Sequence, residues 1–512
     1  MLRDRPAGGD RYSARDLTVL LVLPLLLNVA AWTLYAELAT SGAIHEDAAE
    51  AWAWGREFQL GYYKHPPFWA WIAGLWFMVM PQRNWAFSLL AVLNANVGLL
   101  GAWALIGRFT SGEKRAAATL LLLATPLYTF LCFKYNANTI FLSLWPWTGY
   151  AFLRSVEERG LWPAVLFGLL AAAALLSKYY AVLLLGSCAL ALLAHPGAKT
   201  YLRSASPYVS AGVAALLLAP HLWWLATTGF LPIRYLQSER VDSYGVILGK
   251  ALIFLLECLI FHALVFGLLL AADPQALGFW RRRPGLLAEP RGRILAILAL
   301  APALLTAAAG LVVGIRVSPN MAVGVFCLSP LLLIEIAGIG DIRQLRRLAG
   351  ATAVLVTLAA LATAPFTGAY RFSWGHLATI QPRMELAAES TRVWREATGT
   401  PLAIVGGDPP WIDTVAFYSP DRPRVFTELD FRLAPWITPR AIADRGLLII
   451  CSDQNAHCLG RASQLAPAAH ADAAAPRGQP QRPALQLRPG PAARERSGEW
   501  RQPRTWAGPI LT

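Results

Sequence analysis

The chain of 512 residues is 56% hydrophobic and only 15% charged, and its mean hydropathy is +0.44. Too little polar surface exists to cover a soluble domain of this size, so the composition excludes an ordinary soluble protein and indicates a polytopic membrane protein. The net charge of +14 does not indicate a nucleic-acid partner, because the basic residues form short clusters between apolar runs.

Apolar runs that approach the roughly 20 residues needed to cross the hydrocarbon core recur up to residue 365. We interpret about eleven of them as membrane spans. A further run at 68–80 is too short to span and too aromatic for a loop, so it predicts a helix at the membrane interface. The predicted spans lie at 17–35, 85–109, 116–132, 139–153, 161–176, 181–194, 208–226, 246–272, 294–314, 321–339 and 348–365.

The loops between these runs form two alternating sets that differ in Lys and Arg content. The positive-inside rule predicts that the set with roughly twice as many basic residues is cytoplasmic, together with the N-terminus. The loop after the first span then lies outside, and an odd number of spans places everything after residue 365 outside too. The basic set contains Arg3, Arg5, Arg11, Arg15, Arg108, Lys114, Arg115, Arg154, Arg159, Lys199, Arg203, Arg281 to Arg283, Arg291, Arg293, Arg343, Arg346 and Arg347.

Polar clusters occur in each of the predicted external loops, at the membrane edge. Their cations suit a phosphate group, and their acids suit a general base or a counter-ion. Lysine or arginine side chains that merely extend to lipid headgroups are the alternative for Lys134, Lys178 and Arg316. The clusters are His45 to Glu50, Tyr62 to His65, Lys134 to Asn138, Ser177 to Tyr180, Arg234 to Asp242 and Arg316 to Asn320.

The stretch 45–67 has the highest density of charged and aromatic residues at such an edge. Asp47 has Glu46 beside it and is followed by Trp52 and Trp54 on an expected short helix, which favours a functional acid over a solvated loop acid. His65 precedes two prolines, and a residue in that position is pushed into an extended conformation. This stiff segment would fix where the side chains before it point.

The part after residue 365 alternates helix and strand patterns, which predicts a small α/β domain over 366–460. We expect helices at 384–398, 411–418 and from Thr438, and strands at 402–405, 424–428 and 447–451. Gly406-Gly407-Asp408 lacks the spacing of a nucleotide-binding loop and predicts a turn. Cys451 and Cys458 form either a disulfide or two free thiols. The segment 461–512, rich in Ala, Pro, Arg and Gln, predicts a disordered tail.

The stretch 47–67 resembles the first external loop of bacterial protein O-mannosyltransferase-like and lipid A aminoarabinose transferase-like membrane glycosyltransferases of the GT-C superfamily. That loop has an acidic pair, aromatic-x-Trp, Gly-Tyr-Tyr, an acid, Lys or His, and Pro-Pro. Asp47 aligns with the first acid of the pair, and Gly61-Tyr62-Tyr63 with the middle of the motif. The runs Lys134 to Thr139 and Leu176 to Tyr179 add to the resemblance, which covers the membrane part of the chain.

Two positions depart from the family pattern. The second acid of the pair is Ala48, with Glu46 on the other side of Asp47, and the acid before His-Pro-Pro is Lys64. No cofactor is therefore predicted with any certainty, and the metal requirement is unknown: a divalent metal stays open but unsupported. Asp47 itself matches the pattern.

The resemblance implies a mainly α, GT-C-type transmembrane helical bundle over 1–365 with the small extracytoplasmic α/β domain at its C-terminal side. It implies a glycosyltransferase that moves a hexose or pentose, with inversion, from a polyprenyl-phosphate-linked donor to an envelope lipid, glycan or protein. The partners would be that donor, its acceptor and membrane lipids, without nucleic acid. The location would be the bacterial inner membrane, with the C-terminal domain in the periplasm.

In this interpretation Asp47 is the general base that takes a proton from the acceptor hydroxyl. Cations would stabilise the negative charge that develops on the departing polyprenyl phosphate. The candidate phosphate ligands are Lys64, His65, Lys134, Lys178 and Arg316, and the further substrate-binding candidates are Glu46, Tyr63, Asn136 and Tyr179.

Two other kinds of protein would also place polar residues at membrane depth. A transporter or flippase of lipid-linked glycans is the main alternative, but no internal repeat is visible and the polar clusters lie on one face. A non-catalytic assembly or sensor protein, working through its outer domain, is the second alternative. It would leave the motif of the first external loop without a purpose.

Overall fold

The computed structural model describes residues 21–39, 43–238, 240, 243–274, 285–373, 382–465 and 483–488. The chain divides into two compact units. The first unit comprises Met1–Glu37, Leu60–Trp69 and Ser88–Pro365, and the second comprises Leu38–Gln59, Ala70–Phe87 and Phe366–Thr512. One division falls at residue 365, while the domain ranges predicted from the sequence stay a prediction. The predicted first external loop, in contrast, is shared between the two units.

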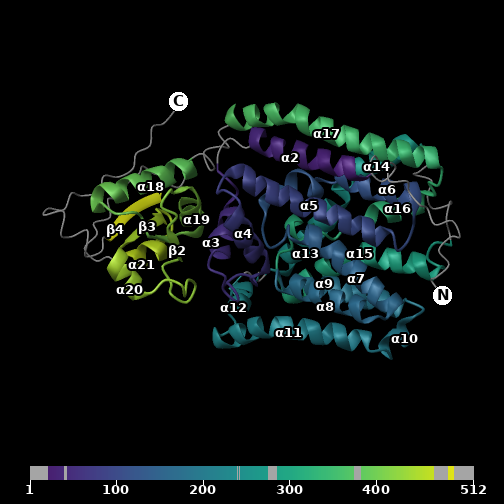
Figure 1. The fold of residues 1–512 in the computed structure, drawn as a ribbon, viewed down its shortest axis with the longest axis horizontal. Coiled ribbons are helices and arrows are strands. Elements are labelled where there is room, and N and C mark those ends of the chain that lie inside the picture. The colour runs from purple at the N-terminus through teal and green to yellow at the C-terminus, as the bar shows by residue number, and fades with distance from the viewer. Residues whose placement is uncertain are drawn as a thin grey trace. The chain divides into compact units, whose positions relative to one another are not determined.

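Helices account for most of the described chain up to residue 373 (Figure 1). Short 3₁₀ helices, labelled η, interrupt them at two places. The elements are α2 Leu23–Ala39, α3 Glu46–Gly55, α4 Phe68–Val79, α5 Asn84–Ile106, α6 Gly112–Leu120, η2 Leu121–Ala124, η3 Pro126–Tyr128, η4 Phe130–Lys134, α7 Phe141–Glu158, α8 Leu161–Leu175, α9 Ala181–Leu193, α10 Ala198–Leu202, α11 Ser206–Thr227, α12 Leu231–Ser238, α13 Tyr244–Ile260, α14 Ala263–Ala272, α15 Pro290–Val313, η6 Pro319–Ala322, α16 Ser329–Ala337 and α17 Ile342–Ser373.

Five segments of the described chain are helical, long and apolar enough to cross a membrane: Asn84–Ile106, Ser206–Thr227, Tyr244–Ala272, Pro290–Val313 and Ile342–Ala362. Shorter apolar helices accompany them, including α2, α8 and α9. The chain is thus a multi-pass membrane protein, as its composition predicts, while the number of about eleven spans stays a prediction. The predicted short aromatic helix is α4, and its place at the membrane interface stays a prediction.

Three of the predicted apolar runs are not single helices. The run 246–272 divides into α13 and α14, and the other two contain 3₁₀ helices. The run 116–132 leaves the α-helix at Leu120 and continues as η2, η3 and η4, because Pro126 cannot donate a hydrogen bond and Thr125 before it is extended. The run 321–339 begins in η6 and becomes helical only at Ser329. Gly324 between them has φ +86, and a Cβ there would lie 2.5 Å from the Phe141 carbonyl oxygen.

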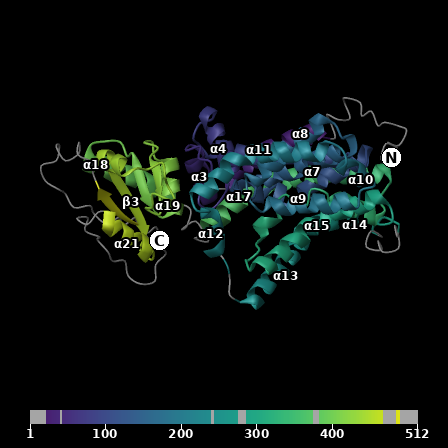
Figure 2. The same ribbon diagram turned by 90° about the horizontal axis from the view of Figure 1, so that it is seen from below.

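Small residues let helices of the first unit approach closely. A Cβ on Gly168 of α8 would lie 2.6 Å from the Ser210 carbonyl oxygen of α11, and the Ser210 hydroxyl donates to the Ala164 carbonyl oxygen at 2.8 Å. Such contacts are typical of helices packed within membranes, where no water drives association. Figure 2 shows α13 at an angle to the neighbouring α15.

The second unit contains the predicted α/β domain. A sheet in the order β2-β1-β3-β4 is formed by β1 Ile404–Gly407, β2 Arg424–Thr427, β3 Leu447–Ser452 and β4 Pro483–Arg488, with β1 parallel to β2 and β3. Its helices are α18 Pro382–Thr398, α19 Pro409–Tyr418, α20 Pro439–Arg445 and α21 Ala456–Leu465, and α18 and α21 lie on opposite sides of the sheet (Figure 1, Figure 2). The strands and helices expected between 384 and 451 are confirmed.

Part of the predicted tail is structured. Helix α21 runs past residue 461, and β4 pairs antiparallel with β3 from Leu447↔Arg488 to Ser452↔Pro483. The alternation Pro-Ala-Leu-Gln-Leu-Arg supplies two leucines at strand spacing, which compositional bias had obscured. The other residues of the tail, residues 1–20 and the Arg281 to Arg283 cluster lie outside the described residues.

The glycines after β1 form the expected turn. Gly407 has φ +130, and a Cβ there would lie 1.9 Å from the Ile450 carbonyl oxygen. The Asp408 carboxylate accepts from the Ser452 N–H at 2.5 Å and from the Asn455 side-chain amide at 2.6 Å. Asp408 therefore joins the loop after β1 to the loop after β3, and these contacts describe a structural turn.

Cys451 at the end of β3 and Cys458 in α21 form a disulfide with Cα atoms 5.7 Å apart. Because the closed loop is short, we expect the double variant Cys451→Ser/Cys458→Ser to lower the free energy of unfolding of the outer domain by about 2–3 kcal/mol. Thermal unfolding followed by circular dichroism would measure this difference. Reduction of the wild type should reproduce the loss, and equal stability with and without reductant would contradict the prediction.

Candidate functional site

Residues 60–69 of the first unit form a short segment fixed by backbone and side-chain hydrogen bonds. The Tyr62 N–H donates to the His65 carbonyl oxygen at 3.0 Å, which closes a turn around Lys64. The Phe68 N–H donates to the Leu176 carbonyl oxygen at 2.8 Å, at the end of α8. Turn, prolines and these hydrogen bonds together fix the segment, as predicted from Pro66-Pro67.

A column of stacked rings supports the start of this segment. His221 of α11 stacks between Tyr179 and Trp224, with ring centroids 5.9 and 5.6 Å away. Its Nδ1 lies 2.7 Å from the Leu60 carbonyl oxygen and its Nε2 lies 3.0 Å from the Tyr179 hydroxyl. Gly61 lies against Trp224, since a Cβ there would be 2.4 Å from the indole ring. The hydroxyl of Tyr179, which is predicted to bind substrate, therefore contacts His221, and His221 in turn contacts the start of this segment at Leu60.

The cations predicted from the external loops differ in their surroundings. The Lys178 Nζ donates to the Asn138 side-chain oxygen at 2.7 Å, which links the loop after α8 to the loop before α7. The Lys64 Nζ lies 5.2 Å from the centroid of the buried Tyr63 ring, and Tyr63 packs edge-on against Tyr235 with centroids 6.0 Å apart. Lys64 and Lys178 both act electrostatically on His65, so the structure brings these three together.

The His65 ring is neutral at neutral pH. Burial of the ring, assisted by the positive charges of Lys178 and Lys64, lowers the pKa of His65 well below 6.5. The phosphate-binding role predicted for His65 is therefore limited to hydrogen bonding, because a neutral imidazole can hydrogen-bond a phosphate but cannot neutralise its charge. The two lysines carry the positive charge at this position.

This lowered pKa predicts acid sensitivity. Below about pH 6.5 the unfolded state binds a proton at His65 that the folded state excludes, so stability is full above that pH and declines as the pH falls. We expect the melting temperature to decline between about pH 7 and 5, and His65→Gln to decline less steeply. Differential scanning fluorimetry would measure the slope of melting temperature against pH for the wild type and for His65→Gln. The exposed His457→Gln is the control, and a His65→Gln slope equal to the wild-type slope would contradict the assignment.

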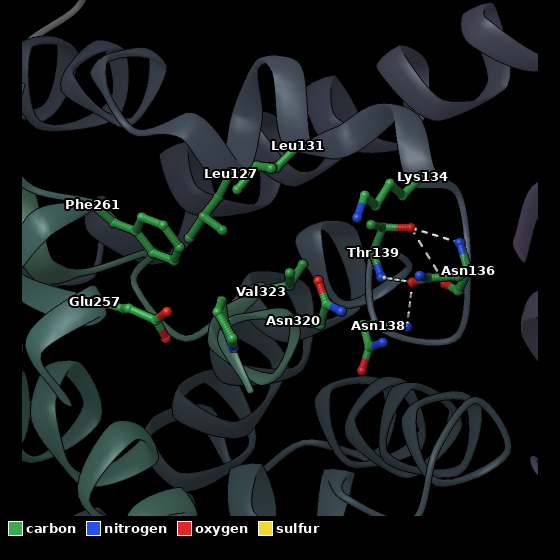
Figure 3. A pocket seen from close by; sticks show the side chains of 11 residues that line it. Leu127, Leu131, Lys134, Asn136, Asn138, Thr139, Glu257, Phe261, Asn320 and Val323 are labelled. Atoms are coloured by element: carbon green, nitrogen blue, oxygen red, sulfur yellow. Dashed lines mark hydrogen bonds between the residues drawn. The ribbon is translucent and has the colours of Figure 1, made fainter. Parts of the chain in front are cut away.

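A cavity of about 400 Å³ opens beside the Lys178–Asn138 contact, within the size range of small-molecule sites. Figure 3 shows the Lys134 ammonium directed into it from the end of η4, with Asn138 and Thr139 nearby. The interrupted helices explain this cavity, because non-helical backbone at membrane depth is tolerated where it lines a polar space. Its lining is Leu127, Leu131, Lys134, Asn136, Asn138, Thr139, Glu257, Phe261, Pro319, Asn320 and Val323.

Asn136 has a structural role at the edge of the cavity. Its side-chain oxygen accepts from the Asn138 and Thr139 N–H groups, both at 2.9 Å, and the Thr139 hydroxyl accepts from the Asn136 N–H at 2.8 Å (Figure 3). This closed turn leads into α7. The side-chain oxygen of Asn136 thus forms the loop, while a substrate-binding role of Asn136 stays a prediction.

Asp47 belongs to the second unit, in the first turn of α3. His45 precedes that helix, and its Nδ1 accepts from the Asp47 N–H at 3.2 Å and lies 3.7 Å from the Asp47 carboxylate. A carboxylate in the first turn of a helix interacts favourably with the helix dipole. The Asp47 side chain is partly exposed, so it is accessible to a substrate.

The neighbouring acid Glu46 is occupied by an ion pair. Its carboxylate lies 2.7 Å from the guanidinium of Arg383 in α18, and that guanidinium also lies 5.7 Å from the Trp411 ring. Farther along the loop, Glu57 is paired with Arg424. Helix α3 is thus attached to the α/β domain within one unit, while the substrate-binding role of Glu46 stays a prediction.

Several residues at these sites were not predicted from the sequence. Glu257 and His221 were each visible as a lone polar residue inside an apolar run, but nothing in the sequence showed that they face the loops of the first unit. Asn320 belongs to the predicted polar cluster Arg316 to Asn320 but was not a candidate site residue, and Arg383 carried no pattern at all. Arg316 is exposed and does not line the cavity, so its phosphate role remains only a prediction. Among the described residues there is no cluster of three His, Cys, Asp or Glu side chains suited to a metal.

Comparison with known proteins identifies a family model and a relative that match parts of this chain. The family model of dolichyl-phosphate-mannose-protein mannosyltransferases matches residues 64–224, which include Lys64, His65, Lys134 and Lys178. Lipid A galacturonosyltransferase RgtD of Rhizobium johnstonii is 24% identical over 212 residues. That match spans 41% of this chain and 44% of the relative, so the chain covers less than half of the relative's length.

Solved structures match over nearly the full length of the chain. Crystal structures of ArnT from Cupriavidus metallidurans, bound to undecaprenyl phosphate and in the apo state, each give a TM-score of 0.60 at 14% identity. The first match covers 92% of this chain and 98% of ArnT, and the second covers 93% and 98%. The chain therefore shares the fold of ArnT, which agrees with the fold implied by the resemblance.

Proposed function

We propose that this protein is a membrane glycosyltransferase that moves a sugar from a polyprenyl-phosphate-linked donor to an envelope acceptor. The observation that carries the proposal is the set of polar side chains around Lys134, Asn138 and Lys178 at a cavity formed by interrupted helices. The family match covers these same positions. The ArnT structure with bound undecaprenyl phosphate supports the choice of lipid, since that protein shares the fold.

The donor phosphate would interact with the lysines of the first unit. Lys134 forms no hydrogen bond or ion pair with any residue that the structure describes, and its ammonium is directed into the cavity (Figure 3). Lys178 is oriented by Asn138, and Lys64 belongs to the fixed turn before Pro66. Positive charge at these positions would stabilise the phosphate as it departs, because its negative charge grows in the transition state.

Asp47 would act as the general base. Its carboxylate would accept the proton of the acceptor hydroxyl as that oxygen forms a bond to the anomeric carbon and the bond to the phosphate oxygen breaks. Attack from the face opposite the phosphate inverts the anomeric configuration. His45 fixes the first turn of α3, because its Nδ1 accepts from the Asp47 N–H at 3.2 Å, and a carboxylate in that turn interacts favourably with the helix dipole.

The reaction is proposed to occur on the periplasmic face of a bacterial inner membrane. The distribution of Lys and Arg among the loops supports this orientation. The Cys451–Cys458 disulfide supports it as well, because disulfides persist in oxidising compartments. The sugar would be a hexose or pentose, and the acceptor a lipid, glycan or protein of the envelope.

Mass analysis of envelope lipids and glycans tests this function. A strain lacking the protein should lose one sugar from an envelope component and accumulate a polyprenyl-phosphate sugar. Wild-type protein should restore the sugar. An unchanged envelope profile, with no accumulated donor, would contradict the proposal.

Transport of a lipid-linked glycan remains a second candidate, because interrupted helices around a polar cavity also occur in transporters. An assay with detergent-solubilised protein distinguishes the glycosyltransferase from the transporter. A glycosyltransferase forms a new glycosidic bond in micelles when donor and acceptor are both present, whereas a transporter needs a bilayer with two sides and forms no bond.

A further inference from the structure

Glu257 lies near the middle of the apolar segment Tyr244–Ala272, one of the candidate spans. An ionisable residue inside such a segment is costly and generally serves a function. The Glu257 side chain is half-buried, and Figure 3 shows its carboxylate directed into the cavity. The carboxylate forms no hydrogen bond or ion pair with any residue in the described part of the chain. Nothing within that part compensates its charge.

Lys134 enters the same cavity from the opposite side. Figure 3 shows the Lys134 ammonium and the Glu257 carboxylate on opposite sides, with Asn320 between them. They form no salt bridge with each other. The cavity therefore presents two unlike charges that are separated by a space of about 400 Å³. A ligand with an anionic end and a hydrogen-bond-donating end would satisfy both.

We propose that Glu257 selects the sugar of the donor, accepting hydrogen bonds from the hydroxyl or ammonium groups of a neutral or amino sugar and excluding a uronic acid. This inference rests on the proposed function, with the donor phosphate at Lys134. A uronate carboxylate placed at this end would meet a like charge in a partly desolvated space, which is strongly unfavourable. The Asn320 side chain adds a polar group along the path between the two ends.

The apolar lining is consistent with a cavity that binds the phosphate at the Lys134 end and the sugar at the Glu257 end. Leu127, Leu131 and Phe261 form an apolar wall beside the two charges. Such a wall suits the C–H face of a sugar ring or the first isoprene unit of the lipid, and polar groups at the ends then fix the orientation. The specificity predicted for this protein thus differs from that of a galacturonosyltransferase, whose sugar carries a carboxylate.

Binding of purified full-length protein in detergent to four lipids tests the inference without knowledge of the acceptor. The lipids are undecaprenyl phosphate and its conjugates with a hexose, an aminohexose and a hexuronic acid. Wild-type protein should bind the hexose and aminohexose conjugates about tenfold or more tightly than the hexuronate conjugate. Glu257→Gln should remove that preference by strengthening hexuronate binding, while Glu289→Gln, which removes an exposed acid of the same unit, should keep it.

Undecaprenyl phosphate without a sugar separates this inference from the proposed function. It should bind wild type and Glu257→Gln equally, which also shows that the variant is folded. Wild-type protein that binds the hexuronate conjugate as well as the others, or a Gln variant that keeps the preference, would overturn the inference alone. Failure of the wild type to bind undecaprenyl phosphate would overturn the proposed function and the inference with it.

Discussion

Replacing Asp47 by Asn should lower the rate of sugar transfer by about 10²–10⁴-fold, the usual contribution of a general base. The amide keeps the size of the side chain and its place in the first turn of α3, but it cannot take the acceptor proton. Transfer would be measured with purified protein, a polyprenyl-phosphate sugar and an envelope extract of the deletion strain as acceptor. Binding of undecaprenyl phosphate should be unchanged, because the phosphate is assigned to the lysines of the first unit.

Asp444→Asn provides a matched control in the second unit. Asp444 is exposed on α20 and makes only a 3.6 Å ion pair with Arg440, so its loss should leave transfer unchanged. Glu46→Gln should have an intermediate effect, because it breaks the pair with Arg383 and loosens the attachment of α3. If Asp47→Asn transferred sugar at the wild-type rate, a group other than Asp47 would have to take the proton of the acceptor hydroxyl.

Replacing Lys134 by Gln should weaken binding of undecaprenyl phosphate by about 10–100-fold. A hydrogen bond to a charged group contributes about 1.5–3 kcal/mol, and no residue in the described part of the chain pairs with Lys134 in place of the phosphate. The amide can still donate a hydrogen bond but removes the charge. Microscale thermophoresis in detergent would measure the two dissociation constants.

Lys199→Gln is the matched control, because Lys199 is exposed in α10 and distant in sequence from every lining residue of the cavity. Its dissociation constant should equal that of the wild type. Lys178→Gln should also weaken binding, because it removes a second positive charge assigned to the phosphate. Equal affinity of Lys134→Gln and wild type would remove Lys134 from the phosphate site.

Much of the fold follows from local sequence pattern. Apolar runs, strand alternation and the Thr438-Pro439 start predicted their elements within a few residues, because these depend on neighbours in sequence. Thr438 accepts from the Ala441 N–H at 3.1 Å, as an N-cap should. The errors include places where apolar composition continued but α-helical hydrogen bonding did not, at Thr125-Pro126 and at Gly324.

The candidate site was only partly predictable. Asp47, Lys64, Lys134 and Lys178 stood out as charges beside apolar runs, and this position relative to lipid can be read from sequence alone. Their partners could not be predicted. Glu257 is separated from Lys134 by more than 100 residues, and no local pattern shows that two such residues line one cavity.

By itself the sequence determined the membrane class, the α/β character of the outer domain and the chemical content of the stretch 45–67. Each of these depends on composition or short-range periodicity. Tertiary structure alone decided that residues 60–69 and α3 belong to different compact units, that Glu46 is engaged by Arg383 and that burial keeps His65 neutral. These features depend on contacts between distant segments, and the burial and charge that set a side chain's chemistry arise only when those segments pack.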